Sequence, residues 1–297
     1  MLVDRQGRPS QLPNLPPDSY RDVRVSPNGA RLALATGDDI LTYDITSARV
    51  SRVTTDASGD RSPLWTPDGA RIIYTSLRAG YPQLFSRPAD GSGTDEPVLT
   101  RSMNLLSLRA TGWSADGTRL LFTEVEADAR SAIGQVAIDR PAEVQVLLEN
   151  AFYNDSGVVS PNGQWMAYQS TLSGPQSEIY IARYPELGDR RTISTDGGTR
   201  PFWSRDGTEL YFGSLDNRQM LAVTITVSPS LVIGTPRVLF DFPILPIRGG
   251  PRPYDITPDV RFVIIQRDPA DVTRTGASNV ILVQNWFEEL KRLVPAN

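Results

Sequence analysis

The stretch SPNGARLALATGDDILTYD (26–44) decides the fold, because variants of it recur along the chain. It begins with a tight turn, continues as an apolar segment, breaks at Gly37–Asp39 and resumes. Ser at the first turn position can bond the backbone, Pro presets φ, Asn suits the third position, and Gly adopts the positive φ that follows. The turn therefore predicts a reversal between two antiparallel strands, with a third strand after the break.

Six copies of the turn are present, at 26–29, 66–69, 114–117, 160–163, 204–207 and, degraded to TPDV, 257–260. Their starts are 40, 48, 46, 44 and 53 residues apart, which is the period of a four-stranded propeller blade. One such sheet would expose both faces, and a ring of copies buries them. We predict an all-β fold, a six-bladed β-propeller of four-stranded antiparallel blades that occupies residues 1–297 as a single domain.

Ring closure is expected to involve both ends of the chain. The sixth copy has a candidate third strand, NVILVQNW (279–286), but then runs into a short amphipathic helix predicted at 286–294. Spare N-terminal segments precede the first blade. We therefore expect the N-terminal residues to complete the sixth blade and the helix to dock on the ring.

Composition excludes several chemistries. The chain has no His and no Cys, and its one Lys is Lys291. Ser-His-Asp and Cys-His catalysis and imidazole metal sites are therefore excluded, and a Ser-Lys dyad would need the terminal lysine. The net charge of −4 does not indicate binding to nucleic acid or to an anionic membrane, and no apolar run is long enough to span a bilayer. We expect a soluble chain, a monomer, with no nucleic-acid or membrane partner.

The units WTPDGARIIYTS (65–76) and WSRDGTELYFGS (203–214) resemble the WD40-like PD40 repeat of the TolB propeller family. Three further segments, VDRQG (3–7), STDGGTRPFWSRDG (194–207) and VQNWFEELKRLVP (283–295), resemble propeller regions attached to bacterial serine/threonine kinases or winged-helix regulators. The resemblance implies a bacterial sensory or scaffolding propeller, in the cytoplasm or periplasm, without its effector. It also implies protein binding at the channel mouth, as in TolB.

The loops that lead into the inner strand of each blade are the default place for a site. Counted from the residue before each turn, an Arg recurs three or four positions upstream in five blades, and blade four offers an Asp: Arg21, Arg61, Arg109, Arg200, Arg252 and Asp155. Such guanidiniums suit carboxylate or phosphate, so we predict a protein partner or small anionic ligand at this mouth. The alternative is that each Arg pairs with a nearby carboxylate such as Asp22, Asp60, Asp155 or Asp255.

Aromatic residues near these loops could form a stacking rim or pack between blades: Tyr20, Phe152, Tyr153, Phe202 and Tyr254. Of these, Tyr153 and Tyr254 join the predicted ligand-binding set. No cofactor is expected. A metal would need oxygen ligands, which suits Ca²⁺, and the candidates are Asp22, Asp60, Asn154, Asp155 and Asp255.

Two functions of different classes remain open on the sequence. The first is a non-catalytic binding propeller that presents an Arg-rich channel mouth. The second is a propeller hydrolase of the esterase or lactonase type, working without His or Cys through an oxygen-liganded metal or a carboxylate base, with Arg holding the oxyanion. We favour the first and assign no catalytic residue.

Overall fold

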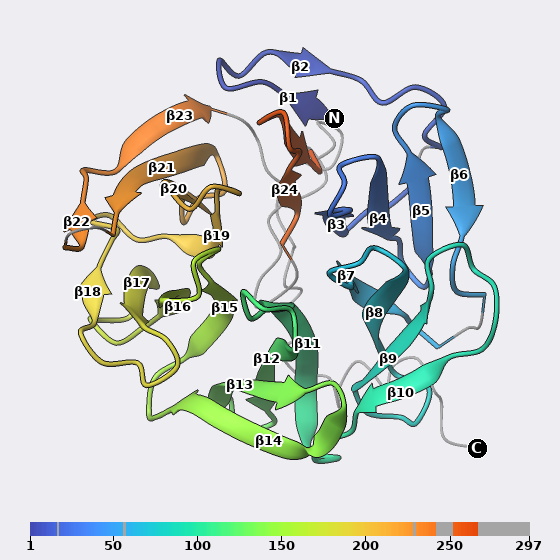
Figure 1. Cartoon of the computed structure of the whole chain (residues 1–297), viewed down its shortest axis with the longest axis horizontal. Coiled ribbons are helices and arrows are strands. Elements are labelled where there is room, and N and C mark those ends of the chain that lie inside the picture. The colour runs from blue at the N-terminus through green and yellow to red at the C-terminus, as the bar shows by residue number, and fades with distance from the viewer. Residues whose placement is uncertain (17, 56–57, 228–229, 242–251, 267–297) are drawn as a thin grey trace, which may run out of the picture. The chain divides into compact units, whose positions relative to one another are not determined.

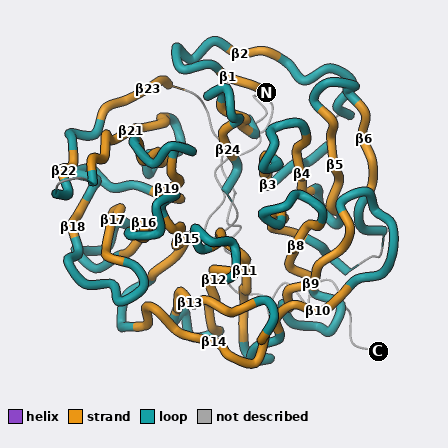
Figure 2. Tube along the Cα trace, viewed as in Figure 1, coloured by secondary structure: helices purple, strands orange, loops and turns teal. Residues whose placement is uncertain are grey.

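Six antiparallel sheets form a six-bladed β-propeller in the computed structural model, which describes residues 1–16, 18–55, 58–227, 230–241 and 252–266. The propeller lies within the unit Met1–Gln266, and the unit Arg267–Asn297 lies outside the described residues. Figure 1 shows the sheets of the first unit arranged around a common axis, and Figure 2 shows that strands and loops make up its described part. This confirms the predicted fold class.

Five blades follow one another in sequence. Blade one contains β3 (Asp22–Val25), β4 (Arg31–Ala35), β5 (Ile40–Asp44) and β6 (Arg49–Arg52). Blade two contains β7 (Arg61–Trp65), β8 (Arg71–Ser76), β9 (Gln83–Pro88) and β10 (Glu96–Leu99). Blade three contains β11 (Leu105–Trp113), β12 (Arg119–Glu126), β13 (Ser131–Ala137) and β14 (Arg140–Glu149).

Blade four contains β15 (Asn154–Val159), β16 (Trp165–Ser170), β17 (Glu178–Arg183) and β18 (Arg191–Thr192). Blade five contains β19 (Thr199–Trp203), β20 (Glu209–Gly213), β21 (Gln219–Thr226), β22 (Val232–Ile233) and β23 (Arg237–Asp241). Its outer position is shared, because β22 and β23 both pair with β21.

The sixth blade joins the two ends of the described chain. It contains β24 (Tyr254–Ile256), β25 (Phe262–Ile264), β1 (Leu2–Val3) and β2 (Pro9–Ser10), in that order from the axis outward. Leu2 pairs with Val263, so the N-terminal residues complete the blade, as predicted. They supply its third strand as well as its fourth, which corrects the assignment of 279–286 to the third position. Residues 279–286 and the helix predicted at 286–294 lie outside the described residues.

The turns repeat the same hydrogen bonds in all six blades. In the first, Ser26 Oγ donates to Asn28 Oδ1 at 2.8 Å and accepts from Arg31 N at 2.9 Å. The degraded copy keeps this chemistry, because Thr257 Oγ1 donates to Asp259 and accepts from Arg261 N at 3.0 Å. Val260 takes the positive φ, 61°, that Gly takes elsewhere. Side-chain chemistry, rather than Gly alone, therefore defines the turn.

The core lies between neighbouring blades. The tryptophans before three of the turns hold the inner strands together: Trp65 Nε1 donates to Arg24 O at 3.0 Å, and Trp113 Nε1 donates to Trp65 O at 2.9 Å. Trp203 Nε1 does the same to Val158 O at 3.2 Å. Each indole thus satisfies its N–H on the preceding blade, and the rings of Trp65 and Trp203 are buried. This ladder fixes the inner strands, on which the candidate site lies.

Candidate functional site

The first strand of each blade lines the axis of the propeller. Residues on or beside all six of these strands border one cavity: Asp22, Arg24, Ser62, Arg109, Ala110, Thr111, Ser156, Val158, Arg200, Pro201 and Arg252. We call this the axial cavity. Six residues that stand five positions before each turn Ser or Thr, within or just before these strands, form what we call the mouth ring: Arg21, Arg61, Arg109, Asp155, Thr199 and Arg252.

One buried ion pair joins two blades within the mouth ring. Arg109 Nη2 lies 2.5 Å from Asp155 Oδ1, with the two side chains 6% and 2% exposed. Tyr153 donates its hydroxyl to Asp155 Oδ2 at 2.9 Å, so both carboxylate oxygens are engaged. Burial alone would lower the pKa of Arg109, but Asp155 and Tyr153 offset it and the pKa is raised. The pair therefore locks blade three to blade four.

Two further arginines pair within the region where blades six and one meet. Arg252 Nη2 donates to Asp255 Oδ1 at 2.9 Å, and its guanidinium lies over the Phe202 ring at 4.8 Å. Arg24 is paired with Asp22 and also donates to Arg252 O at 2.9 Å. Burial raises the pKa of Asp22 to about 6, although Arg24, Arg252 and Arg109 oppose the rise. Pairing with carboxylates, the alternative from sequence, thus applies to Arg109 and Arg252.

Three of the predicted arginines have no such partner among the described residues. The guanidiniums of Arg21, which is exposed, and Arg61, which is half-buried, make no ion pair or hydrogen bond there. Burial lowers the pKa of Arg61, and the positive charges of Arg109 and Arg21 lower it further. Arg200 is 6% exposed, and its guanidinium makes only long hydrogen bonds, 3.4 Å to Thr199 Oγ1 and to Asn217 Oδ1. The mouth therefore carries positive charge that the described carboxylates do not neutralise.

Backbone bulges occur at equivalent places on three of the inner strands. Ser62, Ser156 and Arg200 each stand four positions before the turn and have positive φ, 54°, 58° and 52°. Their strands all shift register next to these residues. A bulge with an unusual φ re-aims a side chain and is common beside binding sites. The sequence gives no sign of it, because Ser and Arg are ordinary strand-edge residues.

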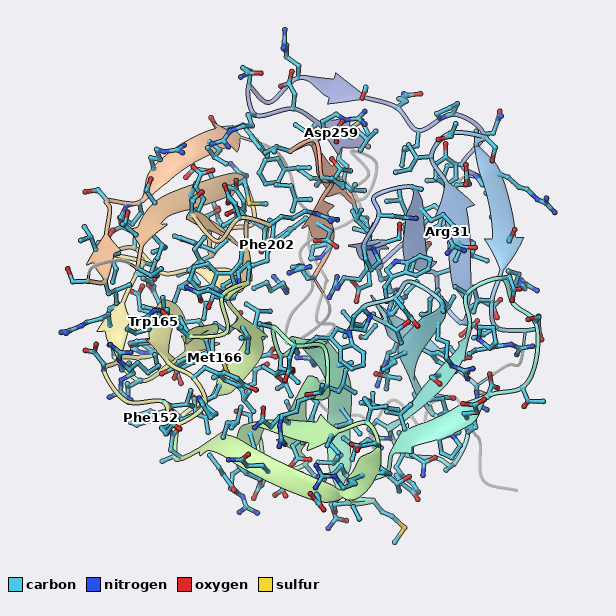
Figure 3. The ribbon with its side chains drawn as sticks, viewed as in Figure 1. Arg31, Phe152, Trp165, Met166, Phe202 and Asp259 are labelled. Carbon is cyan, nitrogen blue, oxygen red and sulfur yellow. The ribbon has the colours of Figure 1, made fainter. Side chains whose placement is uncertain are left out.

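Two of the five predicted rim aromatics, Tyr254 and Phe202, are core residues. Tyr254 is 1% exposed, and its hydroxyl accepts from Gly213 N at 3.1 Å and lies 3.0 Å from Arg200 O. Phe202 packs beside it, with ring centroids 5.4 Å apart. In Figure 3 Phe202 lies towards the inside of the ring and Phe152 at its edge. Tyr153 donates its hydroxyl to Asp155 Oδ2, and Tyr20 donates its hydroxyl to Pro16 O. We therefore leave Tyr254 out of the site proposed below.

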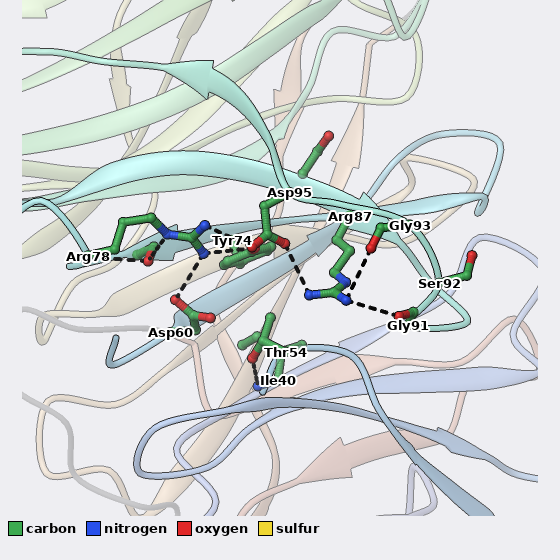
Figure 4. A network of polar contacts seen from close by, with 12 residues as sticks. Ile40, Thr54, Asp60, Tyr74, Arg78, Arg87, Gly91, Ser92, Gly93 and Asp95 are labelled. Atoms are coloured by element: carbon green, nitrogen blue, oxygen red, sulfur yellow. Dashed lines mark hydrogen bonds and ion pairs between the residues drawn. The ribbon is translucent and has the colours of Figure 1, made fainter. Parts of the chain in front are cut away.

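The predicted oxygen ligands do not assemble. Within the described residues, no group of three carboxylates is placed to hold a metal ion. Asp60 instead faces Arg78 at 4.0 Å, and Arg78 also contacts Asp95 at 2.8 Å and stacks over Phe85 at 4.1 Å. Figure 4 shows Arg78 between the two carboxylates. Asp60 thus belongs to a charged network that ties the start of β7 to the outer part of blade two.

Two features of the site were missed from sequence. Arg24 lies mid-strand in DVRV (22–25), and the alternation of strand side chains puts it on the same side as Asp22. That pair of charges two residues apart was an available signal. Ser62 had none, since a lone Ser before Pro63 is common in loops and edges.

The comparisons with known proteins agree with this architecture. A family model described as the TolB beta propeller domain, PD40, matches residues 21–177. A TolB homologue from Chlorobium luteolum is 29% identical over 147 residues, which span 49% of this chain and about a third (32%) of that relative. Within the described part of the chain, no helix has the length and apolar character needed to cross a bilayer.

Solved structures share the fold at low identity. The TolB structure from Agrobacterium tumefaciens has a TM-score of 0.64 at 22% identity, covering 76% of this chain and 82% of that one. An oligogalacturonate lyase in complex with manganese has a TM-score of 0.55 at 12% identity, covering 84% and 90%. The same fold therefore serves unlike proteins, and fold alone does not choose a function. Because the family model matches more than half of its residues, the chain belongs to the TolB β-propeller (PD40) family.

Proposed function

We propose that this propeller is a non-catalytic binding module whose mouth ring takes the anionic group of a small ligand or of an acidic protein segment. One observation carries the proposal. Arg61 is half-buried beside Arg21 and Arg109, and its guanidinium has no counter-ion among the described residues. A cluster of like charges costs free energy unless an anion joins it.

The chemistry of the cluster fits that ligand. A guanidinium is planar, stays charged at any physiological pH, and presents donors that match both oxygens of a carboxylate or phosphate. Arg21 and Arg61 begin neighbouring inner strands, and the blade-to-blade ladder of indoles holds those strands in place. Pre-arranged donors reduce the ordering cost of binding. The TolB resemblance adds that the anionic group can belong to a protein partner.

The hydrolase alternative finds less support. Its carboxylate base would be Asp155, but both oxygens of Asp155 are engaged by Arg109 and Tyr153. A base in that setting is poorly placed to accept a substrate proton. Turnover of a panel of esters and lactones that is lost in Asp155→Asn would nevertheless promote it over the binding proposal.

The binding test uses two double variants of equal charge change. Arg21→Ala with Arg61→Ala removes two mouth guanidiniums. Arg140→Ala with Arg191→Ala removes two exposed guanidiniums from the outer strands β14 and β18. We expect inorganic phosphate or a hexaglutamate peptide, titrated by calorimetry at low salt, to lose at least about tenfold in affinity with the mouth variant, since each charge-assisted contact contributes roughly 1.5–3 kcal/mol. An equal loss with both variants would mean that only net charge matters.

A further inference from the structure

The axial cavity contains three buried polar atoms that lack a hydrogen-bond partner among the described residues. They are Asp22 Oδ2, Arg24 Nε and Ser62 Oγ, in side chains whose residues are 0%, 7% and 2% exposed. All three residues border the same cavity. Buried polar atoms are nearly always satisfied, so three unsatisfied atoms at one place indicate a missing partner rather than a packing accident.

The size of the cavity limits what that partner is. Its volume is about 20 Å³, while a single water needs roughly 10–15 Å³ measured in this way. This volume fits one water or one ion of similar size. Arg109 and Arg252 belong to both the axial cavity and the mouth ring, whereas Arg21 and Arg61 do not border the cavity.

The charges around the cavity favour an anion. Arg24, Arg109, Arg200 and Arg252 border it, while Asp22 borders it and Asp155 and Asp255 pair with two of those arginines. Four guanidiniums against three carboxylates leave one positive charge when all are ionised. Arg24 Nε and Ser62 Oγ are both able to donate to an anion, but ionised Asp22 is not.

Protonation of Asp22 removes that conflict. As a carboxylic acid, Asp22 would donate its proton through Oδ2, so the unsatisfied atoms of all three residues that border the cavity would become donors. The pKa of Asp22 is raised to about 6 by burial, against the attraction of Arg24, Arg252 and Arg109, so the acid form is accessible near neutral pH. Arg200, which also borders the cavity, adds to the positive surroundings.

We propose that the axial cavity binds one small inorganic anion of the size of chloride, and that the anion enters together with a proton that Asp22 takes up. The balance is one halide and one proton from solvent for each site, with no net change of charge. By linkage, the bound anion raises proton affinity at Asp22, and the proton raises anion affinity by the same factor. This inference goes beyond the proposed function and does not depend on Arg21 and Arg61, on which that function rests.

Two variants and a matched control test it in solution. Ser62→Ala removes one unsatisfied hydroxyl that borders the cavity. Thr123→Val removes another buried unsatisfied hydroxyl, which does not border it. Melting temperature is measured at pH 5 and pH 8, with chloride exchanged for gluconate at constant ionic strength.

At pH 5 we expect chloride to raise the melting temperature of the wild type and of Thr123→Val by about 5 °C at a hundredfold excess over the dissociation constant. At pH 8 the rise should shrink, and in Ser62→Ala it should be lost at both values. The Asn side chain in Asp22→Asn donates its amide N–H without taking up a proton from solvent. The rise in melting temperature should therefore no longer depend on pH in this variant. A chloride effect that is equal in Ser62→Ala and wild type, or that stays pH-dependent in Asp22→Asn, would overturn the proposal.

Crystals in bromide locate the ion directly. An anomalous peak within hydrogen-bond reach of Arg24 and Ser62 at pH 5, present also in Arg21→Ala with Arg61→Ala, is the expected result. Density for water alone at pH 5 would refute the anion site. Since the mouth variant keeps the axial cavity, failure of either proposal is separable from failure of the other.

Discussion

Replacement of Asp22 by Asn should stabilise the protein at pH 8 and leave its stability nearly unchanged at pH 4. Asp22 is fully buried, its ordinary pKa is 3.8, and burial raises the folded-state pKa to about 6. Between those two values the folded state binds more protons than the unfolded state, so stability falls as pH rises through that window. Above pH 6 the ionised carboxylate carries the full penalty.

The size of the effect follows from the same two values. Each tenfold change in a proton-binding constant corresponds to about 1.4 kcal/mol, so a rise from 3.8 to about 6 corresponds to about 3 kcal/mol. This figure already contains the attraction of Arg24, Arg252 and Arg109 for the ionised form, because they contribute to the folded-state pKa. Asn approximates the neutral acid in shape, and therefore avoids the penalty at every pH.

The assay is urea unfolding of wild type, Asp22→Asn and Asp139→Asn, in gluconate, at unit steps from pH 4 to pH 8. Asp139 is a control, because its side chain is 79% exposed and its removal changes net charge equally. The expected difference between Asp22→Asn and wild type grows from near zero to about 3 kcal/mol across the window. A lower stability of Asp22→Asn at pH 8 would refute the reasoning, since it would mean that the loss of the Arg24 pair outweighs the relief of burial.

Two predictions concern the scaffold. Deletion of residues 1–10 removes β1 and β2 and opens the sixth blade. Because it exposes a sheet edge and removes the core residues Leu2 and Val3, it should lower the melting temperature by about 10 °C or more. An unchanged melting temperature would contradict ring closure. Trp113→Phe removes the indole N–H that donates to Trp65 O at 2.9 Å, and should cost about 1–3 kcal/mol in urea unfolding. Trp165→Phe is the matched comparison, because the buried Nε1 of Trp165 has no hydrogen-bond partner among the described residues.

The turn repeat predicted the fold because its chemistry is local. Ser or Thr, Asx and a positive-φ residue form each turn within five positions, as in Ser26, Asn28 and Gly29. Each copy can therefore be recognised in the sequence without its neighbours. The third strand of blade six was misassigned for the opposite reason. Residues 279–286 have strand-like sequence, but Leu2–Val3 pairs with β25 across the whole length of the chain, and no local pattern reveals such a pairing.

The sequence predicted where the arginines of the site lie, but not which of them form ion pairs with carboxylates. The position of Arg109 relative to its turn put it correctly at an inner strand, yet its partner Asp155 lies 46 residues away and meets it because two blades are adjacent. The bulge at Ser62 depends on backbone register, which the sequence does not encode in any one residue. Thus repeats located the inner strands, while tertiary contacts decided which arginines are neutralised.

Calorimetric titration of hexaglutamate and of inorganic phosphate into the wild type, the mouth variant Arg21→Ala/Arg61→Ala and the control Arg140→Ala/Arg191→Ala tests the central claim most directly. Binding by the wild type and the control, weakened at least about tenfold in the mouth variant, is the predicted result. No binding of either anion to the wild type, or equal binding by all three proteins, would contradict an anion-binding mouth.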